Sequence, residues 1–194
     1  MTRAPAGPAS WWRTGLAAAT ILLLPGPAVP AEPLSPSLLA PLRLVGYSKP
    51  TRAPALDGDT VDGGKISSAS LQGKVVLVNF WASWCLECGP EMEALERLHR
   101  DLAPQGLAVV GVNARENAPA ARRYAQQAGL SFLLVLDPGG AINERYGVVG
   151  IPTTFLVARD GRAVAFGVGP RDWGGPAARV LLETLLAEGH QSAP

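Results

Sequence analysis

The strongest constraint on this chain is an apolar run that leads into two closely spaced cysteines. The run Val75–Phe80 is continuous and rich in β-branched residues, which is typical of a strand covered on both faces. Cys85 and Cys88 follow it, and they are the only cysteines of the 194 residues. Pro90–Leu102 then carries apolar residues at helical spacing. A buried strand that passes through a CxxC turn into a helix predicts an α/β domain.

Further segments alternate between strand and helix patterns along the chain. Alternation of this kind favours a mostly parallel sheet flanked by helices, and Asp160-Gly161 adds an antiparallel hairpin near the end. Strands are expected at Leu107–Val112, Phe132–Leu136, Thr153–Ala158 and Arg162–Val168, and helices at Ala118–Ala128, Ala141–Tyr146 and Pro176–Glu188.

The N-terminus has the layout of an export signal. Arg3 and Arg13 accompany the short apolar stretch Leu16–Leu24, and Val29-Pro30-Ala31 supplies the small residues that a signal peptidase reads. The stretch is about half of the ~20 residues that a membrane-spanning helix needs. We therefore expect residues 1–31 to be a cleaved signal peptide, with a retained N-terminal anchor as the alternative. Either reading predicts a periplasmic or other extracytoplasmic location.

The rest of the chain divides into a linker, one domain and a tail. Residues 32–54 are proline-rich and are interpreted as a linker or N-terminal extension, with Leu42–Tyr47 as a candidate edge strand. Residues 55–189 are expected to form the domain and residues 190–194 a tail. The net charge of +1 gives no basic footprint for nucleic acid, and we expect a monomer.

The position of the cysteines indicates redox chemistry. A helix N-terminus presents unpaired N–H groups and the positive end of the helix dipole, and both stabilise a thiolate. The spacing puts Cys85 at the exposed tip and Cys88 one turn deeper. Cys85 is therefore expected to attack a disulfide, and Cys88 to resolve the mixed disulfide that results.

Other uses of the pair fit the sequence less well. A structural zinc site needs four ligands, and the only histidines, His99 and His190, have no ligand spacing. A purely structural disulfide would close too small a loop to stabilise much. A peroxiredoxin would carry Thr where this chain has Ala82. Delivery of Cu(I) by two thiolates is the main alternative. For the redox function we expect no metal and no cofactor.

Several motifs resemble the exported TlpA/ResA-like thiol–disulfide oxidoreductases, which have a thioredoxin-like fold. They are GKVVLVNFWASWC (73–85), VVGVN (109–113), LLVLDP (133–138), YGVVGIPTTFLV (146–157) and RDGR (159–162). The resemblance covers about residues 57–186 and implies a central mixed sheet flanked by helices. Residues 113–136 resemble the extra helix and strand of this branch.

The resemblance also implies partners. Members of this family reduce disulfides of exported substrate proteins, in cytochrome c maturation or in copper-site assembly. They receive electrons from a membrane thiol-transfer protein of the DsbD/CcdA type. We expect partners of these kinds for this chain.

Roles carry over to single residues on the same basis. Trp84 would shield the attacking cysteine and pack on the substrate. Pro152 would be a cis-proline beside the pair and would leave the backbone of Ile151 open to a partner's strand. Glu91, three residues after Cys88 on the same helix face, would be buried with a raised pKa and would accept the proton of Cys88.

Two positions depart from related proteins. Cytoplasmic-type thioredoxins carry a buried Asp where this chain has Asn79, which cannot titrate. The residue before the second cysteine is usually proline, and here it is Glu87. We expect its charge to oppose thiolate formation and to keep the protein reducing, with contact to a basic partner as the alternative role.

Overall fold

The computed structural model describes residues 1–2 and 34–188. The predicted signal peptide, apart from its first two residues, and the predicted tail lie outside the described residues. Within the described part of the chain, no helix is both long enough and apolar enough to cross a membrane.

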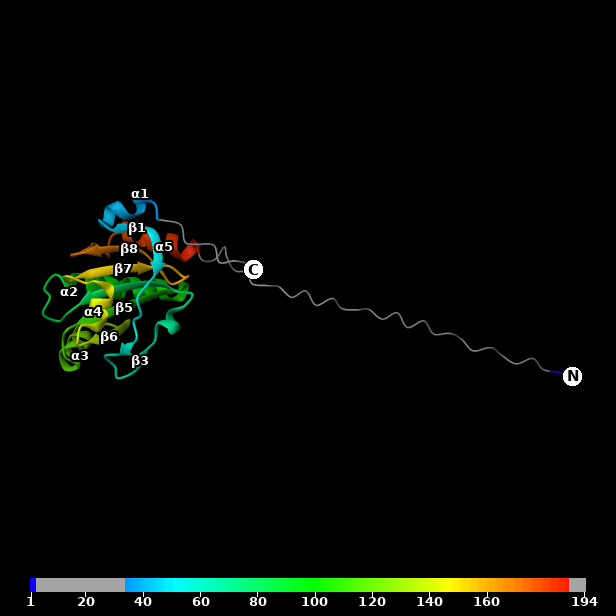
Figure 1. Ribbon diagram of the computed structural model, residues 1–194, viewed down its shortest axis with the longest axis horizontal. Coiled ribbons are helices and arrows are strands. Elements are labelled where there is room, and N and C mark those ends of the chain that lie inside the picture. Colours follow the sequence, from blue (N-terminus) through cyan, green and yellow to red (C-terminus); the bar gives the residue numbers. More distant parts are fainter. Residues whose placement is uncertain (3–33, 189–194) are drawn as a thin grey trace.

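A six-stranded mixed sheet forms the centre of the domain (Figure 1). Its spatial order is β1-β8-β7-β4-β5-β6. Strands β4, β5 and β6 are parallel, whereas β7 is antiparallel to β4, β8 to β7 and β1 to β8. This confirms the predicted parallel core with a terminal hairpin. The strands are β1 (Val45–Arg52), β4 (Val75–Trp81), β5 (Leu107–Ala114), β6 (Leu133–Asp137), β7 (Thr153–Val157) and β8 (Arg162–Val168).

The predicted helices are also present, with ends that differ by at most two residues. The α-helices are α1 (Pro36–Leu39), α2 (Cys88–Leu102), α3 (Ala118–Gln127), α4 (Ala141–Tyr146) and α5 (Pro176–Glu188). Short 3-10 helices are η1 (Ala40–Leu42), η2 (Ser68–Leu71) and η3 (Ala103–Gln105). A small separate hairpin joins β2 (Gly58–Asp59) to β3 (Lys65–Ile66).

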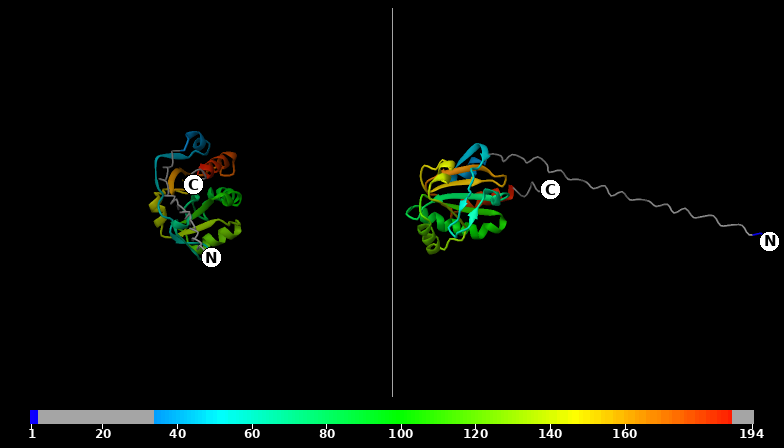
Figure 2. Two further views of the ribbon diagram at one scale, coloured as in Figure 1. Left: turned by 90° about the vertical axis from the view of Figure 1, so that its right-hand side faces the viewer. Right: turned by 60° about the horizontal axis from the view of Figure 1, so that its bottom comes forward.

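The sheet separates two hydrophobic cores, and β4 contributes to both. Leu77 and Trp81 pack in the core that α1, α2, α3 and α5 share, whereas Val78 and Phe80 pack in the core beneath α4. Figure 2 shows helices on both sides of the sheet. Alternate residues of a strand share a face, so Asn79 lies on the α2 side between Leu77 and Trp81. The helix α2 therefore covers a face of the sheet that contains buried polar residues, Asn79 among them.

From Leu34 onward, the segment predicted to be a linker or N-terminal extension is folded against the domain. This segment forms α1, η1 and the edge strand β1, which begins at Val45 rather than at the predicted Leu42. Its prolines at positions 36 and 41 lie in the first turns of the two short helices, where proline is tolerated. Four of its leucines are buried in the α2-side core and explain why the segment docks: Leu34, Leu39, Leu42 and Leu44.

Candidate active site

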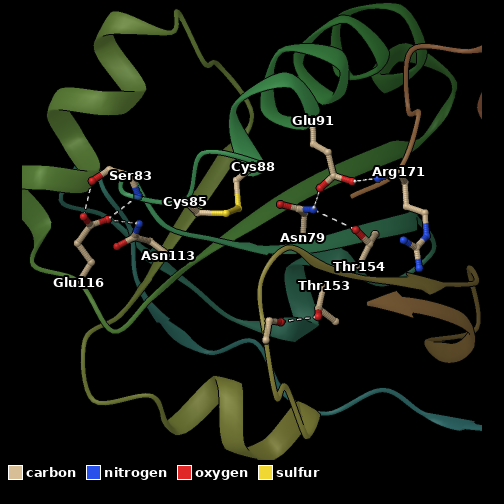
Figure 3. Close-up of a disulfide and its surroundings, with 11 residues drawn as sticks. Asn79, Ser83, Cys85, Cys88, Glu91, Asn113, Glu116, Thr153, Thr154 and Arg171 are labelled. Atoms are coloured by element: carbon tan, nitrogen blue, oxygen red, sulfur yellow. Dashed lines mark hydrogen bonds between the residues drawn. A yellow bond between two sulfur atoms is a disulfide. The ribbon is translucent and has the colours of Figure 1, made fainter. Parts of the chain in front are cut away.

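Cys85 and Cys88 form a disulfide at the junction of β4 and α2 (Figure 3). The Cys85 N–H donates to the Ala82 carbonyl at 3.1 Å, and the Cys88 N–H donates to the Cys85 carbonyl at 3.1 Å. These bonds fold the turn tightly, and Cys88 is the first residue of α2. Cys88 is 1% exposed, whereas Cys85 is only partly buried. The exposures agree with the predicted order, and the roles of attacking and resolving thiol stay predictions.

Glu91 lies one turn along α2 from Cys88 and is 2% exposed. Its Oε2 accepts a hydrogen bond of 3.2 Å from Asn79 Nδ2 on β4. Its Oε1 accepts one of 2.5 Å from the backbone N–H of Arg171. Asn79 Nδ2 also donates to Thr154 Oγ1 on β7 at 3.0 Å. Strand β4 and the segment after β8 thus each donate a hydrogen bond to one buried carboxyl, and β7 is linked to it through Asn79, as Figure 3 shows.

Burial raises the pKa of Glu91 to about 7. The loss of hydration disfavours the charged form, and this effect is larger than the opposing ones. The hydrogen bonds from the Arg171 backbone and from Asn79 lower the pKa, as does the positive charge of Arg171. Glu91 is therefore buried with a raised pKa, as predicted, and it can bind or release a proton near neutral pH.

The Ile151–Pro152 peptide bond is cis, which confirms the predicted geometry. It precedes β7, the strand that pairs with β4. The Pro152 carbonyl accepts a hydrogen bond of 2.8 Å from the Gly169 N–H, and Thr153 Oγ1 donates to the Gly150 carbonyl at 2.6 Å. Ile151 is partly buried and packs against both cores. Contact of these residues with a partner stays a prediction.

Large apolar side chains are exposed in the cysteine turn and just before the cis-proline. Trp84 is 65% exposed, so the predicted aromatic next to Cys85 faces solvent and is not part of the core. Leu86, between the two cysteines, is 93% exposed. Val149, two residues before Ile151, is 90% exposed. Sequence reasoning missed Leu86 and Val149, although an apolar residue inside a CxxC turn is itself a signal.

Glu87 is exposed and occupies the position just before α2. Its side chain makes no capping hydrogen bond to the helix. The carboxylate is therefore in solvent at the N-terminal end of the helix that carries Cys88. Whether its charge affects the thiols stays a prediction.

Glu116 is a further residue of the site that sequence reasoning missed. Its Oε2 accepts hydrogen bonds from the Ser83 N–H at 3.0 Å and from Asn113 Nδ2 at 2.8 Å. Its Oε1 accepts the hydroxyl of Ser83. Burial alone would raise the pKa of Glu116, but these hydrogen bonds outweigh it and lower the pKa. Figure 3 shows Glu116 and Glu91 on opposite sides of the disulfide.

Metal-ligating side chains do not gather in the described part of the chain. Among residues 1–2 and 34–188, no group of three or more His, Cys, Asp or Glu side chains is placed to hold a metal ion.

Comparisons with known proteins identify one matching family and several similar proteins. Residues 50–165 match the AhpC/TSA family. Thiol-disulfide oxidoreductase ResA of Bacillus thuringiensis subsp. konkukian is 34% identical over 104 residues, which are 54% of this chain and 60% of that protein. Thioredoxin-like protein YneN of Bacillus subtilis is 38% identical over 120 residues, or 60% of this chain and 69% of that protein.

A solved structure extends the similarity to the fold. A thiol:disulfide interchange protein of the thioredoxin family from Chlorobium tepidum TLS superposes with a TM-score of 0.65 at 31% identity. The match covers 72% of this chain and 99% of that one. The fold is therefore thioredoxin-like, as predicted. The similarity spans 60 to 65% of the length of the ResA relatives.

Proposed function

We propose that this chain, which belongs to the AhpC/TSA family, is an exported thiol–disulfide oxidoreductase that reduces disulfides of partner proteins. The observation that carries the proposal is the disulfide at the start of α2, with Cys85 partly accessible and Cys88 buried. A pair arranged in this way has one sulfur that a partner can reach and one that only the first sulfur can reach.

The exchange transfers two electrons in two steps. In the reduced protein, the Cys85 thiolate attacks one sulfur of a partner disulfide, and the partner's other sulfur leaves as a thiolate. Cys88, as a thiolate, then attacks Cys85 Sγ and releases the second partner sulfur. The partner disulfide is reduced to two thiols, and Cys85 and Cys88 become the disulfide. A dithiol donor must then reduce the pair again, and a membrane thiol-transfer protein of the DsbD/CcdA type fits this need.

Glu91 supports the second step. Cys88 must lose its proton before it can attack, and its burial disfavours the thiolate. Glu91 lies three residues away on the same helix, and its pKa of about 7 suits a group that accepts a proton at neutral pH. The Cys88 proton passes to Glu91 and from there to solvent as the partner leaves.

The exposed apolar side chains of the cysteine turn and of the segment before the cis-proline fit a polypeptide partner. Trp84 and Leu86 flank Cys85 in sequence, and Val149 precedes the cis-proline segment. Their burial on contact would exclude water from the exchanging sulfurs and would contribute to binding. The partner's backbone would lie along Ile151. Substrates of the cytochrome c maturation and copper-site assembly types both meet these requirements.

Disulfide exchange with insulin tests the activity. The protein, purified after export in a bacterial host, should catalyse insulin reduction by dithiothreitol, and Cys85→Ser should abolish this activity. Cys88→Ser should stop at a one-to-one mixed disulfide. A wild-type protein no faster than Cys85→Ser would refute the proposal. The mass of the exported protein tests the location, because cleavage after Ala31 gives a chain that begins at Glu32.

A further inference from the structure

The turn that carries the attacking cysteine has one side-chain anchor outside itself. Residues 82–87 connect β4 to α2, and all of them are described. Of their side chains, that of Ser83 is the one with a hydrogen bond to a residue beyond the turn. Its partner is Glu116, 33 residues away in the sequence. Trp84 and Cys85 follow Ser83 directly, so the position of Ser83 constrains the positions of both residues.

The parallel pairing of β4 and β5 brings the anchor into reach. Trp81, the last residue of β4, pairs with Asn113 of β5, and the chain leaves both strands at the same edge of the sheet. Asn113 is fully buried and donates to Glu116 Oε2, which fixes the carboxylate from the β5 side. Glu116 then accepts both donors of Ser83, the N–H and the hydroxyl. The carboxylate bridges the two strand ends through three hydrogen bonds.

We propose that Glu116 is a positioning residue that holds the Ser83–Trp84–Cys85 segment in place when the Cys85–Cys88 pair is reduced. In the oxidised protein the disulfide itself ties Cys85 to α2. Reduction removes this tie, and the contact between Ser83 and Glu116 is then the side-chain link that remains. The reduced protein is the form that attacks a partner disulfide. This inference rests on the proposed exchange function.

The chain contains a matched control for this contact. Glu96 on α2 accepts the N–H of Ser131 at 2.7 Å and its hydroxyl at 2.6 Å, in the same two-donor pattern. Its third donor is Arg100 Nε, also at 2.6 Å. Glu96 lies eight residues beyond Cys88 on the helix, or about 12 Å along its axis. Loss of Glu96 therefore removes an equivalent structural contact away from the turn.

Two variants at position 116 separate geometry from charge. Glu116→Ala removes every acceptor for Ser83 and Asn113. Glu116→Gln removes the charge but keeps the contacts, because the amide oxygen accepts the Ser83 N–H and Asn113 while the amide NH₂ donates to the Ser83 hydroxyl. A role in positioning therefore predicts that Gln rescues what Ala loses.

The experiment compares two reactions of each reduced protein. One is the second-order rate of insulin disulfide reduction, which requires an aligned partner. The other is the alkylation rate of Cys85 by iodoacetamide at its high-pH plateau, which requires only an accessible thiolate. Glu116→Ala should slow insulin reduction about tenfold, because a small misplacement of a reacting group slows a reaction that requires alignment. The same variant should change the plateau rate of alkylation by no more than about twofold, because alkylation does not require an aligned partner. Glu116→Gln and Glu96→Ala should each stay within about threefold of wild type in both reactions.

The outcomes distinguish this inference from the proposed function. If Glu116→Ala and Glu96→Ala slow insulin reduction equally, the positioning role of Glu116 is overturned. The same conclusion follows if Glu116→Gln slows insulin reduction as much as Glu116→Ala does. A wild-type protein without exchange activity would overturn the proposed function, and this inference with it. If Glu116→Ala does not fold, Ser83→Ala is compared with Ser131→Ala, the same change at the control contact, and the same difference in insulin reduction is required.

Discussion

Asn79 and Glu91 form a buried pair, in which the amide Nδ2 donates to the carboxyl Oε2 at 3.2 Å. The amide oxygen of Asn79 is also buried and has no hydrogen-bond partner within the protein. The pair therefore combines one titrating group with one neutral amide whose oxygen is unpaired. Because the Asn79 amide does not titrate, Glu91 is the member of the pair that binds or releases a proton.

The first prediction concerns stability against pH in Glu91→Gln. The pKa of Glu91 is raised from 4.5 to about 7, so the folded oxidised chain binds more protons than the unfolded chain between these values. The free energy of unfolding should fall as pH rises through this range, by about 3 kcal/mol at most. Glu91→Gln should lack this fall, and the Asn79 amide can rotate to present its free oxygen to the new NH₂.

Urea unfolding of the oxidised proteins at pH 5 and pH 8 measures the effect. The control is Glu93→Gln, which removes an exposed carboxylate two residues further along α2 and should keep the wild-type pH dependence. If the free energy of unfolding of Glu91→Gln differs between pH 5 and pH 8 by as much as that of wild type, the prediction is wrong. That result would show that ionisation of Glu91 does not destabilise the folded protein.

A second prediction concerns Asn79→Asp. The new carboxylate would lie about 3 Å from that of Glu91, and two carboxylates at this distance cannot both ionise readily in a buried site. The free energy of unfolding should therefore fall more steeply with pH than in wild type. Urea unfolding between pH 5 and pH 8 measures the slope. The double variant Asn79→Asp/Glu91→Gln should restore a slope near that of wild type, since one carboxyl remains. A single-variant slope equal to wild type would contradict the prediction.

The site illustrates what local sequence patterns can predict. The continuous apolar run of β4 and the helical spacing after it placed Cys85 and Cys88 at a helix start, and the spacing from Cys88 placed Glu91 on the same face. The cis bond at Pro152 followed from the resemblance, since no local pattern marks it. These features depend on residues close together in the sequence or on a motif with a known structure.

The features of the site that were not predicted depend on contacts between segments distant in the sequence. Thr154 reaches Asn79 across 75 residues, and the Arg171 N–H reaches Glu91 across 80. Glu116 reaches Ser83 only because β4 and β5 are paired in one register. The packing of residues 34–52 was missed for a different reason. Their prolines are typical of a linker, and the four buried leucines among them have no regular period.

A third prediction concerns the reactivity of the two thiols. Cys85 is partly accessible and precedes the helix, whereas Cys88 is 1% exposed. Iodoacetamide below pH 8 should therefore label Cys85 of the reduced protein at least ten times faster than Cys88, because both access and thiolate fraction favour it. Peptide mass spectrometry at early times measures the two rates. Equal rates would refute the assignment of Cys85 as the attacking thiol.

The last prediction concerns Glu87, which is exposed just before the first turn of α2. Its charge opposes thiolate formation at the neighbouring sulfurs, so it destabilises the reduced form and makes the protein more reducing. Solvent and salt screen an exposed carboxylate, and the effect should be small. At a fixed glutathione ratio, Glu87→Gln should therefore hold a larger reduced fraction than wild type, and low salt should enlarge the difference. Glu93→Gln, which removes a charge from the same helix beyond Cys88, should change this fraction less. A reduced fraction that is unchanged or smaller in Glu87→Gln would exclude the charge effect and would favour contact with a basic partner.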